Sequence, residues 1–180
     1  MAPIRIAWLL VLVGFGCLGQ LSFAQSAKPD TRSADHAEGE RTNQNVPHDP
    51  ELILAVLRDV EAAFSDGDLR RWLSLFHSPY LIMAPEGVIA PSSDEEALAL
   101  IRPQMENLRA RGYVRSELNR PTVKLLSPTT ALAAVEWVRR KGDEEELERL
   151  GATYAFFKAD GSWKIVMLTV HSPSTLPELK

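Results

Sequence analysis

Apolar residues recur with helical spacing in the first part of the region from residue 49 to residue 112 of this 180-residue chain. The first such set follows the i, i+3, i+4, i+7 pattern and consists of Ile53, Val56, Leu57, Val60 and Phe64. Asp49-Pro50 precedes it with a capping side chain and a proline suited to the first helical position. Gly67 follows it, and glycine favours helix ends. These residues predict one amphipathic helix.

Two further helices are predicted by their capping residues. Asp68 can cap a second helix, which Ser78-Pro79 ends. Its narrow apolar face consists of Leu69, Trp72, Leu73 and Phe76. Ser93 to Glu96 form a capping box for a third helix, which extends to Gly112 with Pro103 inside it. Between these two helices, residues 80–84 and 87–90 have the composition of two short strands around a turn.

From residue 113 the pattern changes to long β-strands. Apolar, β-branched and aromatic residues fill residues 113–126, 131–140, 147–158 and 163–171, with turn residues between them. Asp160-Gly161 separates the last two runs, and Asp-Gly between apolar runs is a strong hairpin signal. Helices followed by a meander of strands predict an α+β domain, in which a curved antiparallel sheet packs against the helices.

The N-terminal residues have the features of a secretory signal peptide. Arg5 precedes an apolar run from Ile6 to Leu21, and small residues precede a cleavage position after Ala24. The run is shorter than a membrane span usually requires and contains three glycines, so a permanent membrane anchor is the less favoured interpretation. We therefore predict a signal peptide over residues 1–24 and an exported protein, periplasmic or secreted. The only cysteine, Cys17, would leave with this peptide.

The rest of the chain divides into three parts. Residues 25–48 are rich in polar and charged residues and predict a disordered spacer, because they cannot bury enough apolar surface to offset ordering. Residues 49–173 predict one folded domain, and residues 174–180 a short C-terminal tail.

Net charge and histidine spacing exclude several kinds of partner. The net charge of −4 argues against a nucleic-acid surface. The basic clusters Arg70-Arg71 and Arg139 to Lys141 have acidic neighbours, and we interpret them as solvated faces. The four histidines lack metal-ligand spacing, so neither a metal nor a cofactor is predicted.

The order and spacing of these elements resemble the nuclear transport factor 2-like superfamily, a cone-shaped fold that includes ketosteroid isomerase and polyketide cyclases. The resemblance covers residues 51–173 and rests on FSDGDL from Phe64 to Leu69 and DGSWKI from Asp160 to Ile165. LFHSPY from Leu75 and TVHSP from Thr169 resemble uncharacterised bacterial members most. The resemblance implies a cone cavity for a small, mostly apolar ligand, and it would allow homodimerisation through the outer face of the sheet. It names no activity, since this fold hosts many functions.

The catalytic residues of ketosteroid isomerase are not matched in this chain. Ala84 stands where that enzyme has its general base, before Pro85. Residues 52–64 contain no tyrosine for the oxyanion hole, and Thr153 stands where the second oxyanion donor is an aspartic acid. Steroid-isomerase chemistry is therefore not expected.

Three residues are candidates for another acid–base reaction. His77 is predicted at the end of the second helix near the cavity mouth, although a histidine there also suits the helix dipole. Strict alternation places His171 on one face with Trp163 and Thr169, which either lines the cavity or is a frayed edge. Glu136 lies among apolar neighbours, so it has a raised pKa, a cross-strand partner such as Arg115, Lys124 or Arg149, or an edge position that reaches water.

Five residues are the predicted ligand contacts. They combine an apolar body with a polar tip or a small hydroxyl, and they are Tyr80, Trp137, Tyr154, Trp163 and Thr169. Strand aromatics also serve as ordinary core. Three hypotheses result: a non-catalytic domain that binds a small apolar molecule, which we favour; an acid–base enzyme of the dehydratase, cyclase or hydrolase type; and a homodimerising interaction module.

Overall fold

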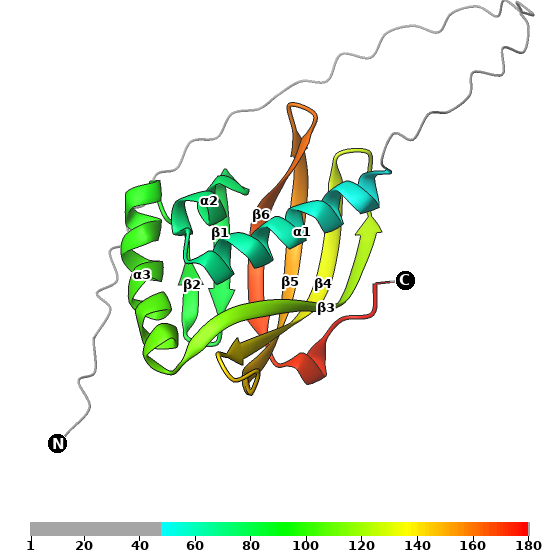
Figure 1. Cartoon of the computed structure of the whole chain (residues 1–180). Coiled ribbons are helices and arrows are strands. Elements are labelled where there is room, and N and C mark those ends of the chain that lie inside the picture. The colour runs from blue at the N-terminus through cyan, green and yellow to red at the C-terminus, as the bar shows by residue number, and fades with distance from the viewer. Residues whose placement is uncertain (1–47, 180) are drawn as a thin grey trace, which may run out of the picture. The chain divides into compact units, whose positions relative to one another are not determined.

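The computed structural model describes residues 48–179, which form three α-helices and one six-stranded sheet (Figure 1). The predicted signal peptide and all of the predicted spacer except His48 lie outside the described residues. Within residues 48–179, no helix is both long and apolar enough to cross a membrane.

Helices α1 and α3 begin and end close to where local sequence signals predict. Helix α1 spans Asp49–Asp66, and the Glu51 carboxylate accepts from the His48 backbone N–H at 3.3 Å in a capping box. Gly67 ends the helix with φ +74°, a conformation that costs glycine little. The Ser93 side chain accepts from the backbone N–H of Glu96 at the start of α3, which spans Asp94–Ala110.

Helix α2 is shorter than the sequence predicts. It spans Leu69–Ser74, and the chain enters strand β1 (Phe76–Ala84) at once, so Phe76 and His77 belong to a strand. The reason is tertiary: the backbone N–H of Ile165 donates to the Leu75 carbonyl at 3.0 Å, and pairing with the sheet replaces the next helical turn. His77 is therefore not a helix-terminal residue.

The sheet has the strand order β2-β1-β6-β5-β4-β3. The remaining strands are β2 (Gly87–Ile89), β3 (Tyr113–Leu125), β4 (Thr130–Lys141), β5 (Glu146–Ala159) and β6 (Ser162–His171), followed by the short 3-10 helix η1 (Pro173–Thr175). All neighbouring pairs are antiparallel except β1 and β6, which are parallel. The predicted α+β class with a curved sheet around N-terminal helices is confirmed, and the sheet is mixed and unclosed.

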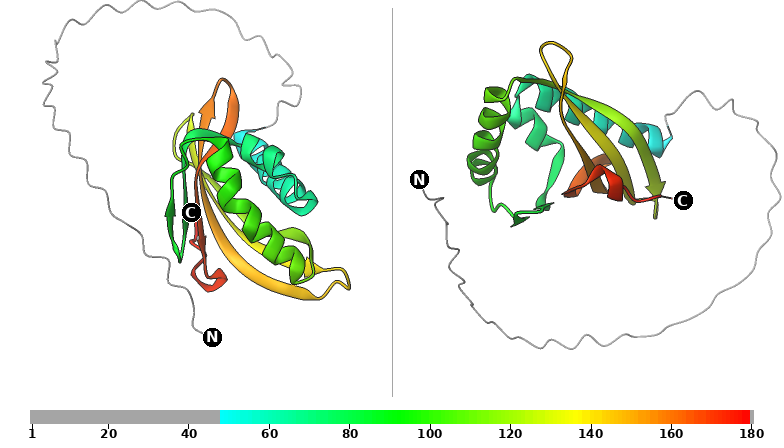
Figure 2. Two further views of the ribbon diagram at one scale, coloured as in Figure 1. Left: turned by 90° about the vertical axis from the view of Figure 1, so that its left-hand side faces the viewer. Right: turned by 90° about the horizontal axis from the view of Figure 1, so that it is seen from below.

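The helices cover one face of the curved sheet (Figure 2). Ile53, Leu57 and Val60 of α1 belong to the same buried core as Val135 of β4 and Ile165 of β6. Figure 2 also shows η1 and the C-terminal residues on the side of the sheet away from α1. The face that packs against α1 is called the inner face below, and the opposite one the outer face.

A β-bulge in β6 changes which side chains reach the inner face. Phe156 pairs with Ile165 and Ala155 with Met167, so Val166 is an additional residue in β6. Ile165 and Leu168 are consequently both buried in the core. The strict alternation predicted for residues 163–171 is therefore wrong beyond Ile165, because one extra residue exchanges the two faces.

Candidate functional site

A cavity of about 70 Å³, partly open to solvent, lies between α1, α2 and the inner face of the sheet. Its walls are mostly apolar and come from every layer of the domain: Val60, Phe64, Trp72, Leu150, Leu168 and Val170. Trp72 is held there by the short helix α2, whose N-terminus is capped by the Asp68 carboxylate accepting from the Arg71 N–H at 3.0 Å. The helix pair and the sheet thus enclose one apolar space.

Two polar aromatic residues form part of the cavity wall. The indole Nε1 of Trp137 on β4 donates to the hydroxyl oxygen of Tyr154 on β5 at 2.9 Å. Burial raises the pKa of Tyr154 well above its ordinary value of 10.0, and the opposing effects of Trp137 and of the Arg139 charge are smaller. The Tyr154 hydroxyl therefore stays protonated at physiological pH.

Arg139 brings a positive charge to the same cavity. Its guanidinium donates to Glu148 and lies 5.4 Å from the ring centroid of Phe64. A carboxylate oxygen of Glu148 also accepts a hydrogen bond from the guanidinium of Arg111, at 2.5 Å. Burial by itself raises the pKa of Glu148, but the contacts with Arg111 and Arg139 outweigh it and hold that pKa below 4.5. In the part of the chain that the structure describes, the buried Nε of Arg139 has no hydrogen-bond partner.

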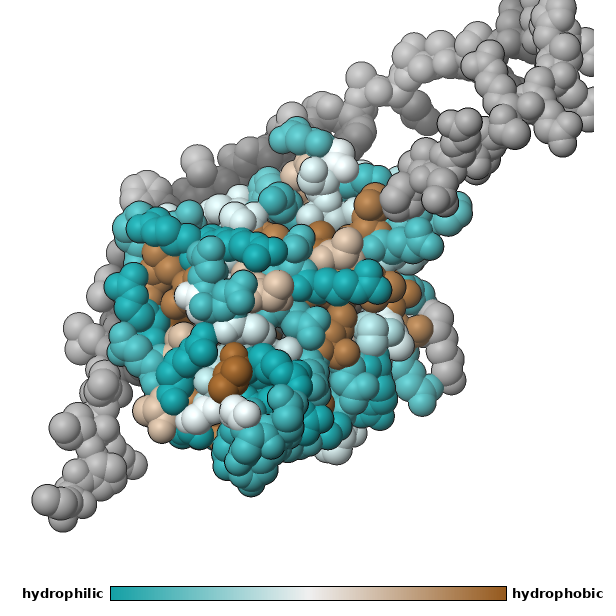
Figure 3. Space-filling view, in the orientation of Figure 1, coloured by the Kyte–Doolittle hydropathy of each residue, from teal (hydrophilic) through white to brown (hydrophobic). Residues whose placement is uncertain are grey.

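Glu61 and Ser116 lie where the cavity meets a shallow surface groove between α1 and the start of β3. One carboxylate oxygen of Glu61 accepts from the backbone N–H of Leu118 at 3.2 Å. The Ser116 hydroxyl is 2.8 Å from the hydroxyl of Tyr113. On the molecular face that carries α1, hydrophilic residues predominate and apolar residues form small separate patches (Figure 3).

Two of the five predicted ligand contacts, Trp137 and Tyr154, line the cavity. Tyr80 is buried in the core, where its hydroxyl has no partner among the described residues, but it is not part of the cavity wall. Trp163 donates its indole N–H to Asp49 at 2.9 Å at the start of α1. Thr169 pairs with Thr153 on the outer face, because of the bulge in β6.

Neither candidate histidine lines the cavity. His77 is exposed on β1 and packs edge-on against Phe157, with 6.1 Å between the ring centroids. His171 lies on the outer face over Gly151, its pairing partner, and one ring nitrogen is 3.0 Å from the Thr153 hydroxyl. Of the two alternatives for His171, the position on the cavity wall is not the one observed, because the bulge that displaces Thr169 also places His171 on the outer face.

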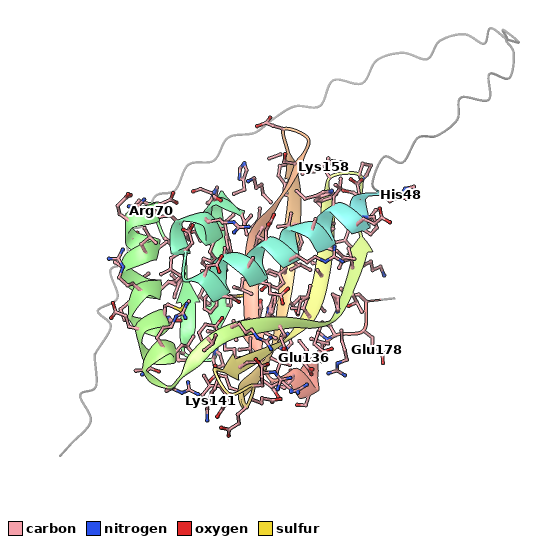
Figure 4. All side chains as sticks on the ribbon, viewed as in Figure 1. His48, Arg70, Glu136, Lys141, Lys158 and Glu178 are labelled. Carbon is pink, nitrogen blue, oxygen red and sulfur yellow. The ribbon has the colours of Figure 1, made fainter. Side chains whose placement is uncertain are left out.

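Glu136 is buried, with 3% of its surface exposed, yet it lies on the outer face of β4 and is fully partnered. It accepts from Asn119 at 2.7 Å, from Arg149 at 2.5 Å and from Arg120 at 2.5 Å. Burial favours a raised pKa, but these three donors outweigh it and the pKa of Glu136 is lowered. The predicted alternative of a partner on a neighbouring strand, Arg149, therefore describes this residue. Figure 4 shows Glu136 and Lys158 near opposite ends of the sheet.

The three acid–base candidates therefore do not meet in one cavity. Most of the residues that line it were not among the predicted contacts, and Arg139, Glu61 and Trp72 are three of them. The sequence places Arg139 in a basic cluster that we interpret as a solvated face, although alternation along β4 puts it on one face with Trp137. Glu61 follows Leu57 by one helical turn and shares its face. Trp72 lies on the apolar face predicted for the second helix. Within residues 48–179, no group of three or more His, Cys, Asp or Glu side chains is arranged to hold a metal ion.

The outer face of the sheet is the surface through which homodimerisation is predicted. Leu81 on β1 and Phe157 on β5 are exposed there, beside paired residues such as Met167 and Ala155. Charged residues occupy the end of the face around Glu136 and Arg149. Homodimerisation stays a prediction.

Comparison with solved structures identifies the fold. A protein with a cystatin-like fold from Novosphingobium aromaticivorans is 17% identical, with a TM-score of 0.60 over 71% of this chain and 83% of that one. A protein of unknown function from Nostoc punctiforme is 15% identical, with a TM-score of 0.57 over 73% and 96%. Aln2 from a Streptomyces species is 10% identical, with a TM-score of 0.58 over 72% and 96%. At these identities the likeness concerns the fold alone.

No curated protein matches the sequence. A family model does match, over residues 51–173, which is nearly the whole folded domain and more than half of the chain. Its description is NTF2-like protein (DUF6841), in agreement with the strand order and the helix-covered inner face. The chain belongs to this NTF2-like family.

Proposed function

We propose that this protein is an exported domain that binds a small, mostly apolar molecule in the cavity between α1 and the inner face of β4, β5 and β6. The observation that carries the proposal is the composition of that cavity. Apolar side chains form most of its wall, and Trp137, Tyr154 and Arg139 supply a few polar groups on it. Binding sites for small molecules typically combine these two features.

The size of the cavity limits the ligand. Its volume of about 70 Å³ is roughly half that of an engineered apolar cavity of about 150 Å³ that admits benzene. A ligand with a handful of non-hydrogen atoms suits the enclosed part. A longer ligand would extend past Glu61 and Ser116 into the surface groove.

Binding is favoured over acid–base catalysis by where the three acid–base candidates lie. His77, Glu136 and His171 are all outside the cavity, and the pKa of Tyr154 is too high for it to act as a base near neutral pH. The export part of the proposal rests on the sequence of residues 1–24, with its early arginine, apolar run and Ala24 cleavage position.

Filling the cavity tests the proposal. Ala152 on β5 lines the cavity, so Ala152→Leu adds three carbon atoms where a ligand would lie. Ala155 is on the outer face of the same strand, so Ala155→Leu is the matched control. We expect small aromatic and branched aliphatic compounds to shift the indole N–H resonances of Trp72 and Trp137, but not that of Trp163, in two-dimensional NMR spectra.

Ala152→Leu should weaken this binding at least about tenfold while Ala155→Leu leaves it unchanged, because only the first substitution occupies the cavity. A stability assay on both variants accounts for overpacking, which typically costs about 1–3 kcal/mol. Unchanged binding by folded Ala152→Leu, or shifts confined to Trp163, would contradict the proposed site.

A further inference from the structure

Two hydrogen-bond donors on residues that line the cavity have no acceptor among the described residues. The Nε of Arg139 is buried and unpartnered, although another guanidinium nitrogen contacts Glu148. The Tyr154 hydroxyl uses its oxygen to accept from Trp137, and its own proton has no acceptor within residues 48–179. Buried donors are rarely left unpaired, because an unpaired donor loses its hydrogen bond to water without gaining another. These donors are on neighbouring strands β4 and β5, which line the same cavity.

We infer that the cavity recognises the carboxylate group of a small apolar acid, with Arg139 and the Tyr154 hydroxyl as the donors that bind it. The inference rests on the proposed function and names its ligand class. A carboxylate oxygen is the acceptor that best matches a guanidinium, since both partners are charged and such bonds are roughly twice as strong as neutral ones.

Charge balance in the ion-pair network of Arg139 supports a negative head group. Arg111 and Arg139 share the single carboxylate of Glu148, so this triad carries one surplus positive charge. Stacking of Arg139 on the Phe64 ring keeps the guanidinium at the wall without supplying an acceptor for Nε. A ligand carboxylate would complete both the charge and the hydrogen bonding.

Glu61 fixes which way such a ligand lies. It is the one carboxylate among the residues that line the cavity, and it lies at the boundary with the surface groove. Because like charges repel, the ligand's carboxylate belongs beside Arg139 and not beside Glu61. If Glu61 were the residue that selects the head group, the protein would prefer amines instead.

A series of compounds that share one apolar body separates these alternatives. Butyrate, butyramide, 1-butanol and butylamine are titrated into the purified full chain at pH 7, and binding is followed on the Trp137 indole resonance. A benzoate and benzamide pair extends the series to an aromatic body. We expect each carboxylate to bind at least about tenfold more tightly than its amide, because only the carboxylate makes charge-assisted bonds.

Two arginine variants show whether Arg139 itself binds the carboxylate of the ligand. Arg139→Met keeps much of the apolar stem of the side chain. It removes the Nε donor proposed to bind the ligand and the guanidinium nitrogen that donates to Glu148. Arg111→Met removes the other guanidinium from Glu148, and Arg111 does not line the cavity. The preference for carboxylate over amide should vanish in Arg139→Met and persist in Arg111→Met, even where both lose similar stability. If Arg139→Met does not fold, Tyr154→Phe tests the same inference. This variant should lower the preference for carboxylate over amide several-fold.

The outcomes distinguish this inference from the proposed function. Equal affinity for butyrate, butyramide and 1-butanol would show that the cavity binds the apolar part of the ligand without recognising the carboxylate. That result overturns the inference and leaves the proposed function intact. Preference for butylamine overturns it in favour of Glu61. Failure of the whole series and of the aromatic pair to bind overturns both.

Discussion

Glu136 shows how one residue can look functional in the sequence and be structural in the fold. A carboxylate surrounded by Ala134, Val138 and other small or apolar residues suggests a raised pKa and a proton-transfer role. Three donors from β3 and β5 reverse the direction of that shift. Two of them, Arg120 and Arg149, reach it from more solvent-exposed positions. The residue therefore joins three neighbouring strands on the outer face.

Glu136→Gln should lower the free energy of unfolding at pH 7 by about 1–3 kcal/mol, because hydrogen bonds between charged groups are lost in a buried position. The pKa of Glu136 in the folded protein lies below the ordinary value of 4.5, so its stabilising effect is complete above pH 4.5 and is lost as the pH falls further. The difference between wild type and variant should therefore shrink on acidification, as measured by urea unfolding from pH 7 to pH 3.

Glu146→Gln is the matched control for that experiment. Glu146 contacts the same Arg149, at 2.7 Å, but it is exposed, and exposed ion pairs contribute little to stability. A loss as large in Glu146→Gln as in Glu136→Gln, or a Glu136→Gln effect that is independent of pH, would contradict a buried ionised carboxylate.

At the level of elements, local signals predicted the helices and strands well, and long-range pairing accounts for the differences. Capping residues and turns identified α1, α3 and the four long strands, because these signals act within a few residues. The early end of α2 depends on Ile165, which is distant in sequence. The bulge at Val166 depends on the pairing of β5 with β6, and it alone moved Thr169 and His171 out of the predicted site.

The site itself was only partly predictable for the same physical reason. Trp137 and Tyr154 were found from residue type and strand position, and they do line the cavity. Arg139 lies two residues after Trp137, and strand alternation alone would have found it. The unpartnered Nε of Arg139 follows from the positions of Phe64 and Glu148 on other elements, which no local pattern encodes.

Helix α2 gives a prediction at this scale, because six residues hold Trp72 in the cavity wall. So short a helix depends on its cap, and Asp68→Ala should lower the free energy of unfolding by about 0.5–2 kcal/mol. The indole resonance of Trp72 should shift in the NMR spectrum of the variant. Asp66→Ala is the control, since the exposed Asp66 carboxylate is 3.9 Å from Arg71 and caps no helix N-terminus. Equal effects of the two substitutions would argue against a capping role.

In the whole molecule, the two faces of the sheet have different surroundings: one lines the cavity and the other carries a polar network. The inner face and α1 enclose the cavity, whereas the outer face carries the network around Glu136 and the C-terminal residues (Figure 2). The domain also has a defined start. The Asp49 carboxylate accepts from Lys158 at 2.6 Å and from Trp163 at 2.9 Å, which ties the first turn of α1 to the β5–β6 hairpin. These hydrogen bonds lower the pKa of Asp49.

The start of the folded domain at Asp49, together with the predicted signal peptide and spacer, predicts where proteases should cut the chain. Expressed in a bacterial host with its own N-terminus, the protein should be exported, and its intact mass should be that of a chain that begins at Gln25. Brief trypsin treatment should then cut after Arg32 and Arg41 but spare Arg58, which lies inside α1. The resulting fragment, residues 42–180, should unfold at the same temperature as the exported protein, because it keeps Asp49 and both of its partners. Retention of residues 1–24 would refute signal cleavage. Cleavage after Arg58 at a similar rate, or a lower unfolding temperature for the fragment, would instead place the domain boundary elsewhere.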